Sequence, residues 1–312
     1  MLSYLDDDNF VEYVLEKGSI PFLVRGSLAC SANFNFMPLI GIRISGPTHR
    51  VFAVGENTKQ PDDTGTIHVR ELVDEVVFPG EIELPEKTKT GISKALYGLE
   101  LWADFLCLAV GNPKIIVEVQ RPINVVIATH SDFDVRSLDS WGDLFQHYLT
   151  LETSERKKIA ASLWWYRKAC STAYYSVFDS YTAYWNCLEI MFTSEPHNIQ
   201  KQMRTGLLKA DFVSKEDAQQ IVHQCFEVAP KTDRLYQIRN DINHGNIREN
   251  SGVDYRRVYF RGMLLQTIVM KLLYRKLGRS ISSGMNINQE AEQINSPEFQ
   301  DGKPPQSKNQ PT

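Results

Sequence analysis

The feature that most constrains the fold is a run of large apolar side chains at helical spacing in the second half of the chain. They recur at steps of 4, 3, 4, 3 and 4 residues, namely Tyr174, Phe178, Tyr181, Trp185, Leu188 and Phe192. Such a stripe lies along one side of an α-helix, and the helix is stable when other helices cover the stripe. We therefore predict a central helix in an all-α bundle.

Helical periodicity continues on both sides of this helix. Apolar residues at helical spacing predict further helices over residues 152–170, 196–209, 214–228 and 254–277. The last of these has apolar residues along one face and carries Arg256, Arg257 and Arg261 on the other. Residues 151–278 are therefore expected to form one all-α domain.

The first part of the chain has a different pattern, in which short apolar runs are separated by glycine and proline. These runs predict strands over residues 21–32, 39–45, 49–54, 66–79 and 115–127. Helical spacing predicts helices over residues 10–17 and 92–110. The expected fold class is therefore α+β, in which residues 1–150 form a mixed α/β domain with a recognition or regulatory role and the helical domain follows it.

Two segments have weaker patterns. Residues 131–151 are predicted to connect the domains and to dock through Trp141, Leu144, Phe145 and Tyr148. Residues 279–312 are rich in Ser, Asn, Gln, Pro and Gly, and so few apolar side chains do not bury enough surface to offset the entropy of ordering. We expect this tail to be disordered.

Neither the composition nor the cysteines indicate a membrane protein or a secreted protein. The acidic start lacks the regions of a signal peptide, and no run approaches the roughly 18 apolar residues of a membrane span. The 5 cysteines are scattered without a C-x-x-C pair, which is typical of reduced thiols in the cytoplasm. The 7 histidines are equally dispersed, so we expect no metal site and no cofactor.

The charge is distributed unevenly along the chain. Residues 1–151 contain 12 Lys and Arg against 21 Asp and Glu, whereas residues 152–278 contain 19 against 13. The helical domain is thus the basic part of a chain whose net charge is −4. A basic excess favours contact with a polyanion such as RNA, although on helices it is also typical of an ordinary solvated face.

The side chains best suited to catalysis are concentrated in a short helix that ends in a polar cluster. Leu235, Ile238 and Ile242 recur at helical spacing as one buried stripe, and Gly245 is expected to end the helix in the left-handed conformation. The second half of the helix holds a polar cluster that includes Arg239, Asn240, Asn243 and His244. They are therefore expected at a defined helix end rather than in a loop.

Arg239 borders this stripe and needs an acceptor there, because a buried unpaired charge is costly. Glu189 is the one acidic residue in the second half of the central helix. It is either the partner of Arg239 or an exposed surface carboxylate, and the sequence leaves both open. At about 100° per residue, Arg239 and His244 lie roughly 140° apart around their helix.

The pattern Arg239-Asn240-x-x-x-His244 resembles the R-x4–6-H motif of HEPN domains, and the run Arg-Asn-Asp-Ile-Asn-His-Gly is similar to the Apea-like subgroup of that family. As in HEPN domains, the motif lies late in a helical stretch and directly before a long helix. The resemblance covers about residues 152–278. It implies a HEPN-type helical bundle, an acidic residue such as Glu189 near the motif, and a metal-independent endoribonuclease of a prokaryotic defence or toxin system.

RNA carries its own nucleophile, the 2′-hydroxyl, so cleavage needs only a proton acceptor, a proton donor and a stabiliser of the phosphorane charge. His244 is suited to acid–base work near neutrality, and Arg239 supplies donors matched to phosphate oxygens. Asn240 and Asn243 are expected to orient the imidazole or to bind a non-bridging oxygen. The basic residues expected to contact RNA phosphates are Arg248, Arg256 and Arg257.

One histidine does not readily serve both sides of the phosphate. A symmetric homodimer with a composite site supplies two histidines and two arginines, and the resemblance implies that arrangement. The N-terminal domain would sense a trigger or restrain activity, and an antitoxin is a further candidate partner. Two alternatives remain: a non-catalytic HEPN dimer that binds RNA, nucleotide or protein, and a structural role in which His244 only caps the helix and Arg239 only makes an ion pair.

Overall fold

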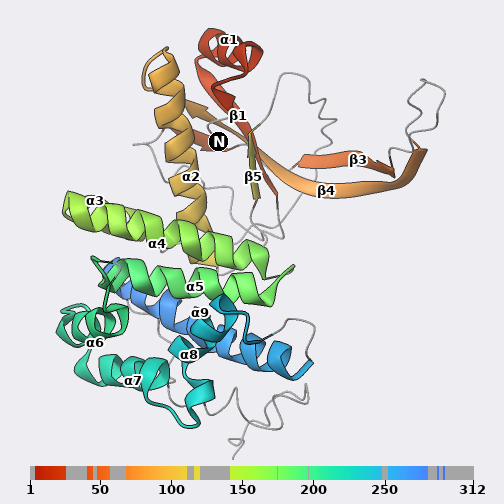
Figure 1. Cartoon of the computed structure of the whole chain (residues 1–312). Coiled ribbons are helices and arrows are strands. Elements are labelled where there is room, and N and C mark those ends of the chain that lie inside the picture. Colours follow the sequence, from red (N-terminus) through yellow and green to blue (C-terminus); the bar gives the residue numbers. More distant parts are fainter. Residues whose placement is uncertain are drawn as a thin grey trace, which may run out of the picture. The chain divides into compact units, whose positions relative to one another are not determined.

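The computed structural model describes residues 4–25, 41–44, 48–56, 68–110, 116–119, 141–173, 175–195, 197–247 and 252–279, together with Ile287 and Ala291. The chain divides into two compact units, Met1–Gly142 and Asp143–Thr312, and each is considered by itself. The first unit holds the β-sheet and the second is built from helices, so the chain is α+β (Figure 1).

The sheet of the first unit is organised around its longest strand, β4 (His68–Glu83). All pairings are antiparallel in the order β2–β4–β1–β5, and β3 also pairs with β4. The partner strands are β1 (Ser19–Arg25), β2 (Ile42–Ile44), β3 (Thr48–Glu56) and β5 (Ile116–Val119). β1 pairs with the second half of β4, whereas β3 and the first half of β4 form a two-stranded ribbon that extends beyond the other strands (Figure 1).

Two helices contact this sheet, α1 (Asp8–Lys17) and α2 (Lys89–Val110). The buried rings of Phe22 on β1 and Trp102 on α2 lie 5.8 Å apart between their centroids and join the sheet to the helix. The ring of Phe22 also lies over Gly80 of β4, where a Cβ atom would come within 2.5 Å of it. Glycine at this position therefore lets the ring lie against the strand.

The strands and helices predicted for the first part of the chain are confirmed within the described ranges, with boundaries that differ by a few residues. The strands follow the short apolar runs between Gly and Pro, and the two helices follow the apolar residues at helical spacing. Parts of the predicted strands lie outside the described residues, namely residues 26–32, 39–40, 45, 66–67, 115 and 120–127.

The second unit is a bundle around α5 (Val177–Phe192). The Ser176 hydroxyl caps the start of this helix by accepting from the N–H of Asp179 at 3.1 Å. The helices with the most contact to α5 are α4 (Thr153–Thr172), α6 (Ile199–Lys209), α8 (Leu235–Asn243) and α9 (Gly252–Lys276). Between α6 and α8 the chain forms α7 (Lys215–Phe226) and the short 3-10 helix η2 (Lys231–Asp233). Figure 1 shows α8 as the short helix that precedes α9.

The central helix predicted from the apolar stripe is α5. Its side chains Phe178, Tyr181, Trp185 and Leu188 are buried, and Phe192 near its end is half-buried. Tyr174, the first residue of the predicted stripe, lies outside the described residues, and the helix begins after it at Val177.

Two segments depart from the sequence-based expectation. Residues 141–150 of the predicted connection form helix α3 (Trp141–Thr150), whose buried Leu144, Phe145 and Tyr148 dock as expected, and the division between the units falls near its start. In the C-terminal tail, Ile287 and Ala291 are buried, and the N–H of Ile287 donates to Gln220 Oε1 at 3.2 Å. The other residues from 280 onward lie outside the described ranges.

No helix in the described part of the chain is long and apolar enough to cross a membrane.

The burial of the described cysteines predicts that their thiols react slowly in the folded protein. Four of them are buried and form no disulfide, namely Cys107, Cys170, Cys187 and Cys225. Burial raises the pKa of the Cys225 thiol to about 12 and that of Cys187 well above its ordinary value. Because the thiolate is the reactive species, a Cys30→Ser variant should react with Ellman's reagent at about pH 8 only after denaturation. Cys30 is replaced because it lies outside the described residues, and fast reaction of the native variant would contradict the burial of the other four.

Candidate functional site

Helix α8 closes as the sequence predicts. The N–H of Gly245 donates to the carbonyl of Ile242 at 3.1 Å, and that of Asn246 donates to the carbonyl of Asp241 at 2.8 Å. This pair of bonds is the Schellman pattern of helix closure. Gly245 has a φ of 67°, in the left-handed region that favours glycine. The polar residues before it are therefore held at a defined helix end.

The buried face of α8 is shorter than the predicted stripe. Leu235 and Ile238 are fully buried, whereas Ile242 is only half-buried. The Tyr181 hydroxyl of α5 donates to the carbonyl of Leu235 at 2.8 Å, and burial raises the pKa of Tyr181 well above its ordinary value, which keeps the hydroxyl protonated. The first half of α8 is thus anchored to α5, and its last turn lies at the surface.

Arg239 is paired with Glu189 of α5, which decides the alternative that the sequence left open. Arg239 Nη2 lies 3.1 Å from Glu189 Oε1, and the two side chains are only 21% and 17% exposed. Arg239 Nη1 also donates to Asn240 Oδ1 at 3.2 Å, while its Nε is buried without a hydrogen bond to the described residues. The guanidinium is therefore held in one orientation with part of its donor capacity unused.

Trp185 supports this pair from inside the bundle, a role that the sequence did not reveal. Its indole Nε1 donates to the same Glu189 Oε1 at 2.6 Å. The fully buried ring packs against Phe226 and Tyr236, with centroid separations of 6.4 and 5.8 Å. The spacing of four residues between Trp185 and Glu189 was the available signal, since it places both on one face of a helix. It did not distinguish this contact from an ordinary core tryptophan.

His244 and Asn243 are exposed at the end of α8. The backbone N–H of His244 donates to the carbonyl of Asn240 at 2.9 Å, so His244 continues the helical hydrogen bonding. Neither side chain makes a hydrogen bond or ion pair with any described residue. Among the described residues, both side chains are therefore exposed without a polar partner.

Asp241 and Arg257 tie α8 to the first turns of α9. Arg257 Nη2 lies 3.4 Å from Asp241 Oδ2 and donates to the carbonyl of Thr232 at 2.8 Å. Arg257 Nη1 lies 4.0 Å from Asp254. Because these acceptors hold the side chain, Arg257 serves the packing of the two helices, and this competes with the predicted contact to RNA phosphates.

The other arginines of the predicted basic face differ in their exposure and in their ion pairs. Arg256 is exposed and forms no ion pair among the described residues. Arg261 is not on an exposed face as predicted: its side chain is 7% exposed and lies 3.4 Å from Asp233 Oδ2. Helical spacing alone misplaced it, because Asp233 of η2 and Gln224 of α7 lie against this side chain. Arg248 lies outside the described residues.

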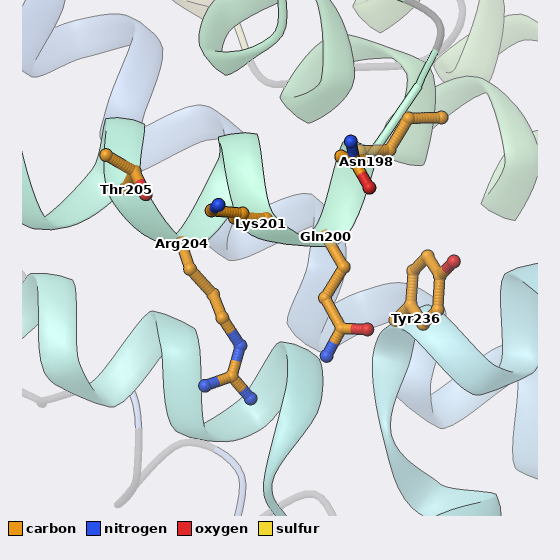
Figure 2. A pocket seen from close by; sticks show the side chains of 7 residues that line it. Asn198, Gln200, Lys201, Arg204, Thr205 and Tyr236 are labelled. Carbon is orange, nitrogen blue, oxygen red and sulfur yellow. The ribbon is translucent and has the colours of Figure 1, made fainter.

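A cleft of about 610 Å³ lies near the opposite end of α8. Its polar lining comes from Asn198, which precedes α6, from Gln200, Lys201, Arg204 and Thr205 of α6, and from Tyr236 of α8 (Figure 2). None of the four motif residues at the end of α8 lines it. The cleft is therefore separate from the site at the helix end, although both use α8.

Within the described ranges, no three His, Cys, Asp or Glu side chains gather closely enough to hold a metal ion. Comparison of the chain with protein-family models, curated proteins and solved structures found no match. Function is therefore inferred from the geometry of the helix end and from the resemblance of its motif.

Closure of α8 by Gly245 can be tested by substitution. We expect Gly245→Ala to lower the free energy of unfolding by about 1 kcal/mol, because a Cβ atom disfavours the left-handed conformation. No atom of the described residues lies within 4 Å of that Cβ, so none of them clashes with it. Gly245→Asn should cost less, since asparagine tolerates this conformation. Urea denaturation measures both, and equal losses for Ala and Asn would contradict the conformational explanation.

The carboxylate of Glu189 should also contribute to stability. Glu189→Ala leaves the half-buried Arg239 and the Trp185 N–H without their acceptor, and we expect a loss of about 2 kcal/mol in the free energy of unfolding. The exposed Glu195 provides the matched control, and Glu195→Ala should change stability by less than about 0.5 kcal/mol. In an Arg239→Ala background the Glu189→Ala loss should shrink. Additive losses in this double-mutant cycle would show that the pair contributes nothing.

Proposed function

We propose that this chain is a metal-independent endoribonuclease of HEPN type, with Arg239 and His244 as its reacting residues. The observation that carries the proposal is the pre-positioned guanidinium: Glu189 and Asn240 hold Arg239 next to a helix end on which His244 is exposed. A fixed donor group and an accessible imidazole are two of the groups that acid–base cleavage of a phosphodiester requires.

In the proposed reaction the 2′-oxygen of the substrate attacks the adjacent phosphorus, and the bond from phosphorus to the 5′-oxygen breaks. The products are a 2′,3′-cyclic phosphate and a 5′-hydroxyl. A histidine removes the 2′-proton or protonates the leaving 5′-oxygen, and the unused donors of Arg239 stabilise the negative charge on the phosphorane. Asn240 keeps the guanidinium oriented, and the exposed Asn243 binds a non-bridging oxygen.

The proposal includes a homodimer, because one imidazole does not serve both sides of the reacting phosphate. His244 and Asn243 are exposed and lack partners among the described residues, which suits a composite site formed with a second copy. Arg256 is exposed on the following helix and is the proposed contact to the RNA backbone. The first unit would sense the trigger or restrain activity in a prokaryotic defence or toxin system.

A second candidate is a non-catalytic HEPN module that binds RNA, nucleotide or protein. The pair of Arg239 with Glu189 is compatible with this candidate, because a half-buried arginine with a carboxylate partner can have a purely structural role. This candidate predicts binding that tolerates His244→Ala.

The deciding experiment is cleavage of end-labelled structured RNA by the full-length protein in excess chelator. We expect cleavage by the wild type, a loss of at least about 100-fold with His244→Ala or Arg239→Ala, and no cut at a single 2′-deoxynucleotide. His197→Ala is the matched control, because His197 is also exposed in the helical unit, and it should retain full activity.

Three outcomes would contradict the proposed endoribonuclease activity. They are cleavage that needs a metal ion, cleavage of the 2′-deoxy substrate, and equal loss in the His197 and His244 variants. RNA binding without cleavage, unaffected by His244→Ala, would favour the binding module. Loss of growth on expression that disappears with either Arg239→Ala or His244→Ala would support the toxin interpretation.

A further inference from the structure

The C-terminal segment of the chain, residues 284–296, makes a buried contact that its composition did not predict. Two residues of this segment belong to the described part of the chain, Ile287 and Ala291, and they are only 1% and 4% exposed. Both have helical conformation, and a separation of four residues places two side chains on the same face of a helix. The segment therefore docks on the folded chain through an apolar face.

Gln220 of α7 marks the place where the segment docks. The backbone N–H of Ile287 donates to Gln220 Oε1 at 3.2 Å, and this bond is buried. The N–H groups in the first turn of a helix have no acceptor within that helix, and a buried amide oxygen needs a donor. Gln220, which is only 9% exposed, therefore satisfies an N–H of the docked segment while its own oxygen is satisfied.

The face of α7 around Gln220 is the face that contacts α9. Asp217, Gln220 and Gln224 follow one another at steps of 3 and 4 residues, so they share one side of the helix. Asp217 forms an ion pair with Arg275 of α9, and Gln224 Oε1 accepts from Arg261 Nη1 of α9 at 3.5 Å. The segment therefore docks at a position of α7 that lies between two contacts joining α7 to α9.

The charges of the segment and of the helical unit are opposite. Ala291 is flanked in the sequence by Glu290 and Glu292, and residues 284–296 contain no Lys or Arg. Residues 152–278 contain 19 Lys and Arg against 13 Asp and Glu. Because opposite charges favour association and orientation, an acidic helix is the kind of segment that suits this unit.

We propose that the face of α7 around Gln220 is a docking surface for a short acidic helix, and that the C-terminal segment of the same chain is its resident, displaceable occupant. The surface recognises two apolar residues four positions apart and an N–H that reaches Gln220. The docked segment acts as a clasp beside the contacts between α7 and α9. The proposal does not depend on ribonuclease activity, because none of these residues takes part in the proposed cleavage.

The covalent connection explains why the chain's own segment occupies the surface. Residues 280–286 join Arg279, which follows α9, to Ile287. A connection of this length gives the segment an effective concentration on the order of 1 mM. A small apolar face and one hydrogen bond provide only a modest affinity, so a separate helix with the same pattern binds once the chain's own segment is disabled.

The test is the binding of a fluorescent synthetic peptide of residues 284–296 to full-length proteins, followed by fluorescence anisotropy. Ile287→Asp in the protein introduces a charge at a buried position and should vacate the surface. We expect the peptide to bind this variant saturably and to bind the wild-type protein at least about tenfold more weakly, because the tethered segment competes. A peptide that itself carries Ile287→Asp should bind neither protein.

Matched substitutions on α7 test the role of the Gln220 amide. Gln220→Met keeps the length of the side chain and removes the acceptor. In the Ile287→Asp background it should weaken peptide binding about fivefold, which is the loss expected for one hydrogen bond. Gln219→Met makes the same change at the exposed neighbouring position and should change the affinity by less than about twofold.

Protease protection tests docking in the wild-type protein without any peptide. An endoproteinase specific for glutamate cleaves after Glu290 and Glu292, which flank the buried Ala291. Intact-protein mass spectrometry should show cleavage there at least about tenfold more slowly in the wild type than in the Ile287→Asp variant.

Four outcomes would overturn the proposal. They are equal cleavage of the wild type and the Ile287→Asp variant, no saturable binding of the peptide to that variant at about 1 mM, equal affinity of the peptide for both proteins, and equal effects of Gln220→Met and Gln219→Met.

Discussion

A half-buried carboxylate joins the core of the helical unit to the side chains at the end of α8. Oε1 of Glu189 accepts from the indole of Trp185 at 2.6 Å and lies 3.1 Å from Nη2 of Arg239. A carboxylate that is only 17% exposed is stable there because donors replace the lost water, and the guanidinium is stable because the carboxylate offsets its charge. The orientation of Arg239 therefore depends on α5 as much as on its own helix.

The same tryptophan contacts residues that support both ends of α8. One edge of Trp185 donates to Glu189, which holds Arg239, while its ring packs against Tyr236, which lines the cleft. Tyr236 and His244 are separated by about 12 Å along α8 at 1.5 Å per residue. Packing on α5 thus positions both ends of a helix that is too short to be stable alone.

Part of the positive charge of the helical unit is neutralised by ion pairs within the unit. Arg257 binds Asp241 and the carbonyl of Thr232, and Arg261 is buried against Asp233. These contacts fix η2 and α8 against α9, because a buried or half-buried arginine needs acceptors. The charge available to a polyanion is therefore smaller than the count of Lys and Arg indicates, and it includes exposed residues such as Arg256 and Lys201.

The sequence by itself determined the closure of α8 and the helices and strands described above, except α3, which lies in the predicted connection. The stripe from Phe178 to Leu188 predicted the central helix, and Gly245 predicted the helix end, because periodicity and capping depend on residues within a few positions of one another. Tertiary structure alone decided that Glu189 reaches Arg239, that Arg261 is buried and that a cleft forms beside Tyr236. Each of these depends on which helices pack together and at what angle, and residues distant in sequence carry no local signal of that packing.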